Sequence, residues 1–93
     1  MSAASACFED YNAVGRMISR ADFALTRSET SRGGFLSFSE AGQFQAKIDN
    51  QTYNNREAIR ANESNGDVEE CHRLRDSAEQ VINQILKEAG VSR

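Results

Sequence analysis

Cysteine and histidine supply the nucleophiles and metal ligands of many small sites, and this chain of 93 residues has two cysteines and one histidine. Cys71 and His72 are adjacent, and neighbouring residues of a helix point ~100° apart, so they cannot act together as nucleophile and base. A zinc site would also need Cys7 and an acid, and no ligand spacing supports one. We therefore predict no catalytic residue, no metal ligand and no cofactor, and a protein that is not an enzyme.

Cys7 and Cys71 lie far apart in the sequence and match none of the short-spaced redox or zinc patterns. The N-terminus has neither the basic start nor the apolar segment of a secretory signal, and no apolar run approaches the ~20 residues of a membrane span. These features predict a cytoplasmic protein. In a reducing cytosol we expect both cysteines to be small core residues and not a disulfide.

The segment HRLRDSA, residues 72–78, resembles the His-x-Leu-Lys-Gly-Ser-Ala helix of histidine phosphotransfer domains. The resemblance covers seven residues and implies that His72 accepts a phosphoryl group and that Arg75 helps to hold it. Asp76 stands one turn beyond His72, where that family has glycine. Its negative charge would oppose a phosphoryl group on His72. A histidine-phosphotransfer-like signalling protein is one alternative function.

Arginines and apolar side chains extend around the first predicted helix, residues 3–27, beyond the stripe that would face a core. Because aromatic and arginine side chains dominate interface energetics, we predict a partner-binding surface there. Its residues are Phe8, Arg16, Met17, Arg20, Phe23 and Arg27. The same arginines could hold a phosphate backbone, so a nucleic-acid-associated regulatory protein is a second alternative.

The composition and charge of the chain limit the classes of protein to which it could belong. A net charge of −3 and a pI near 5.1 have the wrong sign for a protein that neutralises many phosphates, so we do not expect nucleic acid as a partner. With 39% hydrophobic residues, 27% charged residues and no proline, the chain is expected to fold as one domain, residues 1–93, built from long helices.

Apolar or small residues recur in steps of three and four along residues 3–27, as a helix buried along one stripe requires. The stripe consists of Ala4, Cys7, Tyr11, Val14, Ile18, Ala21 and Leu25. The polar stretch that follows ends in a glycine pair and predicts a loop over residues 28–37.

A second helix is predicted over about 38–63, capped by Ser37 or Ser39. Its apolar positions are sparse, and the amide-rich residues 49–55 leave open whether it is continuous or broken near Asn54. Gly66 predicts a stop, and Asp67 with Glu70 predicts an acidic variant of the capping box. A third helix with an apolar stripe of its own is expected over about 67–89.

The predicted fold class is all-α, either a three-helix antiparallel bundle or a long helical hairpin, because no segment alternates apolar and polar residues as a strand does. The first and third helices, the two most apolar, are expected to make the main contact. A core of this size stabilises weakly, so the surplus apolar surface of the first helix predicts a homodimer or a bound partner.

The function that these observations favour is a small non-enzymatic module for protein–protein interaction. It would act as a regulator, adaptor or inhibitor by laying a helix face against another protein, with no role for a membrane.

Overall fold

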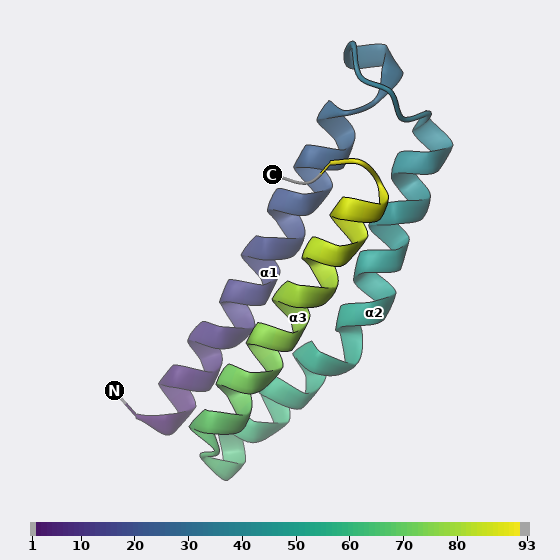
Figure 1. The fold of residues 1–93 in the computed structure, drawn as a ribbon. Coiled ribbons are helices and arrows are strands. Elements are labelled where there is room, and N and C mark those ends of the chain that lie inside the picture. The colour runs from purple at the N-terminus through teal and green to yellow at the C-terminus, as the bar shows by residue number, and fades with distance from the viewer. Residues whose placement is uncertain (1, 92–93) are drawn as a thin grey trace.

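The computed structural model describes residues 2–91 as three helices that run up, down and up along one rod, which confirms the predicted all-α three-helix bundle (Figure 1). The helices are α1 (Ala3–Arg27), α2 (Phe38–Asn65) and α3 (Val68–Glu88), and a short 3-10 turn, η1 (Thr30–Arg32), lies between the first two. The rod measures 45 × 19 × 17 Å. All helix ends lie within two residues of the predicted ones.

The ends of α2 and α3 are fixed by local hydrogen bonds. Ser37 and Glu40 form a reciprocal capping box at the start of α2, and Gly66, with φ 70°, ends this helix in the left-handed region. Asp67 then accepts a hydrogen bond from the backbone N–H of Glu70 and begins α3. Only half of the predicted acidic capping box forms there, because the Glu70 side chain pairs with Arg73 instead.

The loop between α1 and α2 closes tightly on the Ser28 carbonyl, which accepts hydrogen bonds from the backbone N–H groups of Phe35 and Leu36. Gly34 allows this closure, because a Cβ there would lie 2.1 Å from the Ser28 oxygen. The loop thereby places Leu36 over the upper end of the core.

Helix α2 is continuous through its amide-rich middle, which answers the question that the sequence left open. Asp49, Asn50 and Asn54 lie on its exposed side, where they interrupt no packing. Inward, Thr52 is fully buried and donates its hydroxyl to the carbonyl of Ile48. Asn55 donates its amide to the Leu74 carbonyl of α3, at 3.1 Å, so a polar side chain here joins two helices.

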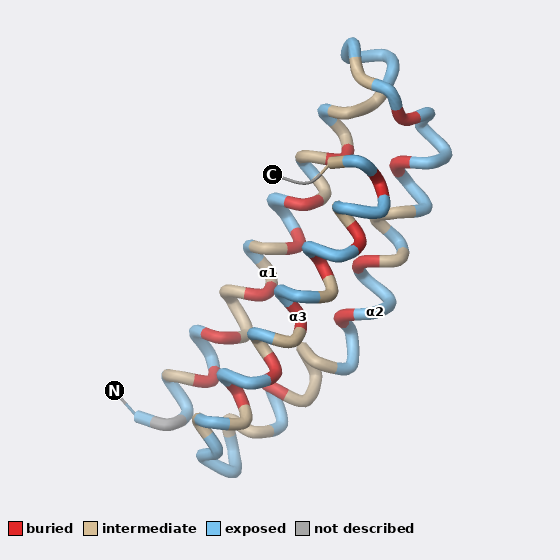
Figure 2. The backbone as a smooth tube through the Cα atoms, in the orientation of Figure 1, coloured by how far each residue is buried: buried red, intermediate tan, exposed pale blue. Residues whose placement is uncertain are grey.

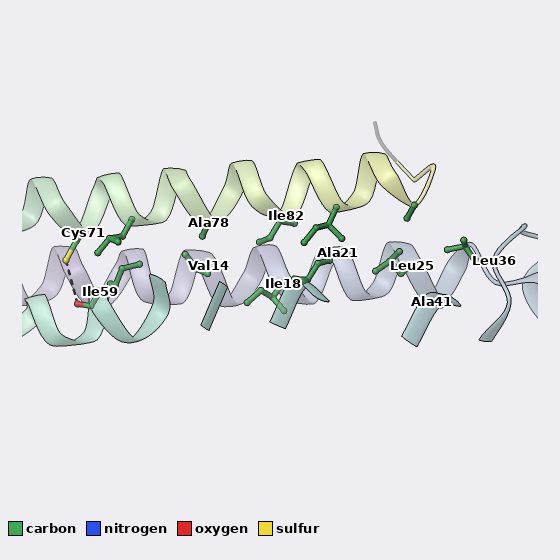
Figure 3. Close-up of a cluster of buried hydrophobic side chains, with 14 of the residues drawn as sticks. Val14, Ile18, Ala21, Leu25, Leu36, Ala41, Ile59, Cys71, Ala78 and Ile82 are labelled. Atoms are coloured by element: carbon green, nitrogen blue, oxygen red, sulfur yellow. Dashed lines mark hydrogen bonds between the residues drawn. The ribbon is translucent and has the colours of Figure 1, made fainter. Parts of the chain in front are cut away.

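The core runs as a continuous seam between the three helices (Figures 2 and 3). Most positions of the predicted stripes are buried in it, with Val14 and Leu25 of α1 among the fully buried ones. The expectation that α1 and α3 make the main contact is wrong, since α2 packs against each of them at least as extensively. Helix α2 is the longest of the three, and its polar side chains add contacts to its apolar ones: Gln45, for example, donates to the Asp22 carbonyl and to the Thr26 hydroxyl on α1.

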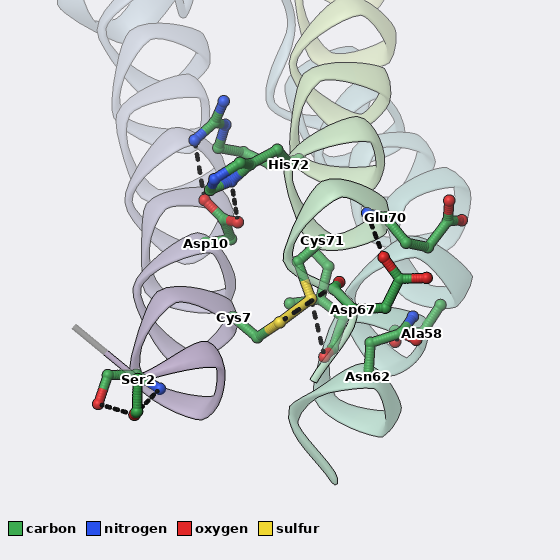
Figure 4. The surroundings of a disulfide bond; sticks show 12 residues. Ser2, Cys7, Asp10, Ala58, Asn62, Asp67, Glu70, Cys71 and His72 are labelled. Carbon is green, nitrogen blue, oxygen red and sulfur yellow. Dashed lines mark hydrogen bonds and ion pairs between the residues drawn. A yellow bond between two sulfur atoms is a disulfide. The ribbon is translucent and has the colours of Figure 1, made fainter. Parts of the chain in front are cut away.

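Cys7 and Cys71 form a disulfide, with their Cα atoms 5.4 Å apart, so the prediction of two unpaired cysteines is wrong (Figure 4). Both side chains are fully buried, as the stripes predicted. They meet because α1 and α3 run in the same direction and begin at the same end of the rod. The bond therefore joins α1 to α3 near their N-terminal ends, through two cysteines that are 64 residues apart in the sequence.

None of the helices within residues 2–91 has the length and apolarity needed to cross a membrane.

Candidate functional site

Five of the six predicted partner-binding residues lie exposed on α1, and we call them the outer face: Phe8, Arg16, Arg20, Phe23 and Arg27. The side chains of Phe8 and Phe23 are 55% and 61% exposed. Helical geometry places them ~22 Å apart along the axis and ~60° apart around it. The guanidinium of Arg27 lies 5.6 Å from the ring centroid of Phe23, close enough for a cation–π contact.

Met17, the sixth predicted residue, lies apart from the outer face. It is partly buried against the core and lines a groove of about 470 Å³ between α1 and α3. Helical geometry places it ~120–180° around α1 from the two phenylalanines. Arg20 of the outer face also lines this groove, so the predicted set extends over two adjoining surfaces, and Met17 lies with Ala21, Ile82 and Leu86 in the groove.

The phenylalanines contribute almost nothing to the core. Four of the five are exposed: Phe8, Phe23, Phe35 and Phe38. Aliphatic residues, alanines and the disulfide fill the interior instead. Exposed aromatic rings of this size indicate a surface for interaction, because a fold gains little from large apolar groups left in water.

A further surface lies between α1 and α2, and we call it the arginine hollow. It is an open depression of about 600 Å³. Its lining residues are Tyr11, Asn12, Gly15, Arg16, Ser19, Arg20 and Arg56. Two arginines of the outer face therefore also border this hollow, and all of its charged lining residues are positive.

Tyr11 organises the cationic side of the hollow. The guanidiniums of Arg56 and Arg60 lie 5.1 and 4.9 Å from the centroid of its ring, and Arg60 also donates to its hydroxyl at 3.2 Å. Sequence reasoning missed both α2 arginines, because their contribution depends on how α2 packs against α1. The signal that could have found them is their four-residue spacing, which places both on one helix face.

A polar cluster of Asp10, His72 and Arg75, which we call the Asp10 cluster, joins α1 to α3 beside the disulfide (Figure 4). Asp10 is only 3% exposed, and its carboxylate contacts Nδ1 of His72 at 2.6 Å and accepts from Arg75 at 2.8 Å. Asp10 is buried although its neighbour Glu9 is exposed. It lies one turn after Cys7, which brings its carboxylate toward α3.

The Asp10 cluster brings together the histidine and the arginine that the phosphotransfer resemblance singled out. Arg75 is already held by two carboxylates, since Asp76 accepts from it as well. Hydrogen bonding to Asp76 and the negative charge of Asp10 raise the pKa of the Arg75 guanidinium above its usual value. We therefore interpret the cluster as an ion-pair network that fastens α1 to α3.

Asp22 of α1 is an unfavourable charge between α1 and α2. Its Oδ1 atom is buried and has no hydrogen-bond partner within residues 2–91. Burial, together with the nearby carboxylate of Asp49, raises the pKa of Asp22 above its ordinary value of 3.8. The native state therefore binds this proton more tightly than the unfolded chain does, so stability falls as the pH rises through 3.8 and then through the native pKa.

We expect Asp22→Asn to raise the melting temperature at pH 7, because an amide removes the buried charge. The group is only partly buried, so solvent screening limits the gain to about 1 kcal/mol, or about 4–8 °C for a domain of this size. Thermal unfolding followed by circular dichroism from pH 3 to pH 8 measures it. The gain should shrink as the pH falls through the raised native pKa of Asp22 towards 3.8, because the wild-type carboxyl is then protonated in the native state.

Glu79→Gln serves as the control, since it makes the same change of net charge at an exposed position of α3. If Asp22→Asn and Glu79→Gln shift the melting temperature equally at pH 7, the effect comes from net charge and the assignment to Asp22 fails.

Within residues 2–91, no three histidine, cysteine or acidic side chains converge as a metal site would require. Searches of protein-family models, of curated proteins and of solved structures find no match to this chain.

Proposed function

We propose that this protein is a small non-enzymatic interaction module that binds a partner protein through the outer face of α1. It would act as a regulator, adaptor or inhibitor, with Phe8 and Phe23 as apolar anchors and Arg16, Arg20 and Arg27 around them. A second copy of the chain or a different protein would occupy the face.

The exposure of Phe8 and Phe23 carries this proposal. The core is complete without them, so their rings are free to fill pockets on a partner. Both lie on one straight helix, which presents them at fixed spacing and with little conformational entropy to lose on binding. Arginines beside aromatic anchors are also typical of interface hot spots.

Site-specific cross-linking in the native cell tests the proposal. A photoreactive phenylalanine analogue at position 23 is expected to capture a protein partner, and the same analogue at position 38 serves as the matched control. Phe38 is 83% exposed but lies at the start of α2, away from the outer face. Capture at position 23 should fall when Phe8→Ser and Arg16→Glu are added.

The mass of the cross-linked species separates the two kinds of partner. A product of two chains of 10.3 kDa, with light scattering at twice the chain mass, indicates a homodimer. A heavier or lighter adduct indicates another protein. Equal capture from positions 23 and 38, or none from position 23, contradicts the proposed face.

The sequence predicts a cytoplasmic location, whereas the disulfide points to a different compartment. Disulfides persist in oxidising compartments and are kept reduced in the cytosol, so the Cys7–Cys71 bond favours an oxidising surrounding.

A further inference from the structure

We propose that the arginine hollow between α1 and α2 is a binding site for phosphate groups, carried by a small oligophosphate or by a nucleic-acid backbone. This site is a second function beside the docking of a protein by Phe8 and Phe23, and the two surfaces share Arg16 and Arg20.

The ion pairs of this molecule lie away from the hollow, so the arginines around the hollow keep their positive charge. The ion pairs within residues 2–91 use Lys47, His72, Arg73 and Arg75, and each of them involves α3. The arginines around the hollow, in contrast, have no carboxylate within 4.0 Å in the described part of the chain. These are Arg16, Arg20, Arg56 and Arg60. A protein with a net charge of −3 thus keeps four cations together without a counter-ion of its own.

Arg56 has an unfilled hydrogen-bonding position. Its Nε atom is buried and donates to no acceptor within residues 2–91. A buried donor without an acceptor costs about 1–3 kcal/mol. A ligand oxygen that accepts a hydrogen bond from this guanidinium would remove that cost. Contact with the Tyr11 ring holds the group in position before any ligand arrives.

The other lining groups suit an oxyanion. Among residues 2–91, no aspartate or glutamate lines the hollow, while Tyr11, Asn12 and Ser19 each carry a group that can donate a hydrogen bond. Guanidinium groups bind phosphate oxygens through pairs of parallel N–H bonds. Where several arginines converge, a single carboxylate satisfies fewer of these N–H groups than a phosphate group does. The volume of about 600 Å³ also exceeds that of one small ion and leaves room for linked phosphates.

Gly15 leaves the floor of the hollow without a side chain. A Cβ added at this position would meet no atom within 4 Å, so helix packing does not require glycine here. Glycine in the middle of a helix costs about 1 kcal/mol relative to alanine. A larger side chain at position 15 should therefore leave the fold intact and obstruct the hollow.

Nuclear magnetic resonance titration with tripolyphosphate, and in parallel with a short DNA duplex, tests the proposal at physiological ionic strength. Binding is expected to shift the backbone N–H signal of Gly15 and the Nε–H signal of Arg56. Arg16→Gln and Arg56→Gln should each weaken binding about tenfold or more. Gly15→Leu should weaken binding similarly without lowering the melting temperature.

Two matched controls separate a site from general attraction. Arg32→Gln makes the same change of net charge in the exposed η1 turn. Gly42→Leu makes the same helix substitution on α2, where a Cβ also meets open space. Both controls should leave affinity within about twofold of the wild type.

Tripolyphosphate binding with these losses supports a small-molecule ligand, and duplex binding with the same losses and no tripolyphosphate binding supports a nucleic acid. The proposal is overturned if neither ligand binds, or if Arg32→Gln weakens binding as much as Arg56→Gln does. Cross-linking from position 23 is independent of these outcomes, so the two proposals fail separately.

Discussion

Replacing Cys7 and Cys71 together with alanine is expected to lower the free energy of unfolding by about 4 kcal/mol and the melting temperature by about 15–30 °C. The disulfide closes a loop across a sequence separation of 64 residues, so its loss returns much conformational freedom to the unfolded chain. A single core of this size supplies only ~3–5 kcal/mol by itself, so the disulfide contributes a large part of the total stability. Urea and thermal unfolding followed by circular dichroism measure the change.

Reductant provides the control for this prediction. Tris(2-carboxyethyl)phosphine should lower the melting temperature of the wild type toward that of the double variant and leave the double variant unchanged. If the double variant and the oxidised wild type unfold at the same urea concentration, the disulfide does not stabilise the native state.

The position of the disulfide also predicts where the weakened molecule opens. The Asp10 cluster joins α1 to α3 one turn further along the rod and remains in the double variant. Hydrogen exchange should therefore accelerate most in the first turns of α1 and α3, around residues 4–8 and 68–72, before the rest of the bundle opens.

Local signals were enough to predict the helices of this fold. Stripes with a period of 3.6 residues identified α1 and α3, and nearly all of their positions are buried or half-buried. Ser37, Gly66 and Asp67 marked the helix ends because capping depends on residues within one turn. The continuity of α2 was not predictable in the same way, since Asn55 and Thr52 are accommodated by contacts with other parts of the bundle.

The polar constellations depend on which helices run in parallel, and sequence spacing does not contain this information. Asp10 meets His72 because α1 and α3 begin at the same end of the rod. The disulfide has the same origin, and the prediction against it rested on an assumed compartment and not on geometry. Of the interaction surface, the exposed phenylalanines and arginines of α1 were found from helix periodicity, whereas Arg56 joined them only through the packing of α2.

Ile48→Ala is expected to cost about 3–4 kcal/mol, because α2 has so few apolar anchors. Its buried residues are Ala41, Ile48, Thr52 and Ile59, so Ile48 is one of only two large aliphatic side chains that hold 28 residues against the bundle. Truncation would leave a cavity beside Thr52, whereas Ile48→Val should cost only about 1 kcal/mol and the exposed Gln51→Ala less than about 0.5 kcal/mol. Urea unfolding of the three variants measures this order. A loss for Ile48→Ala no larger than that for Gln51→Ala would mean that hydrogen bonds such as that of Asn55, and not apolar packing, hold α2 in place.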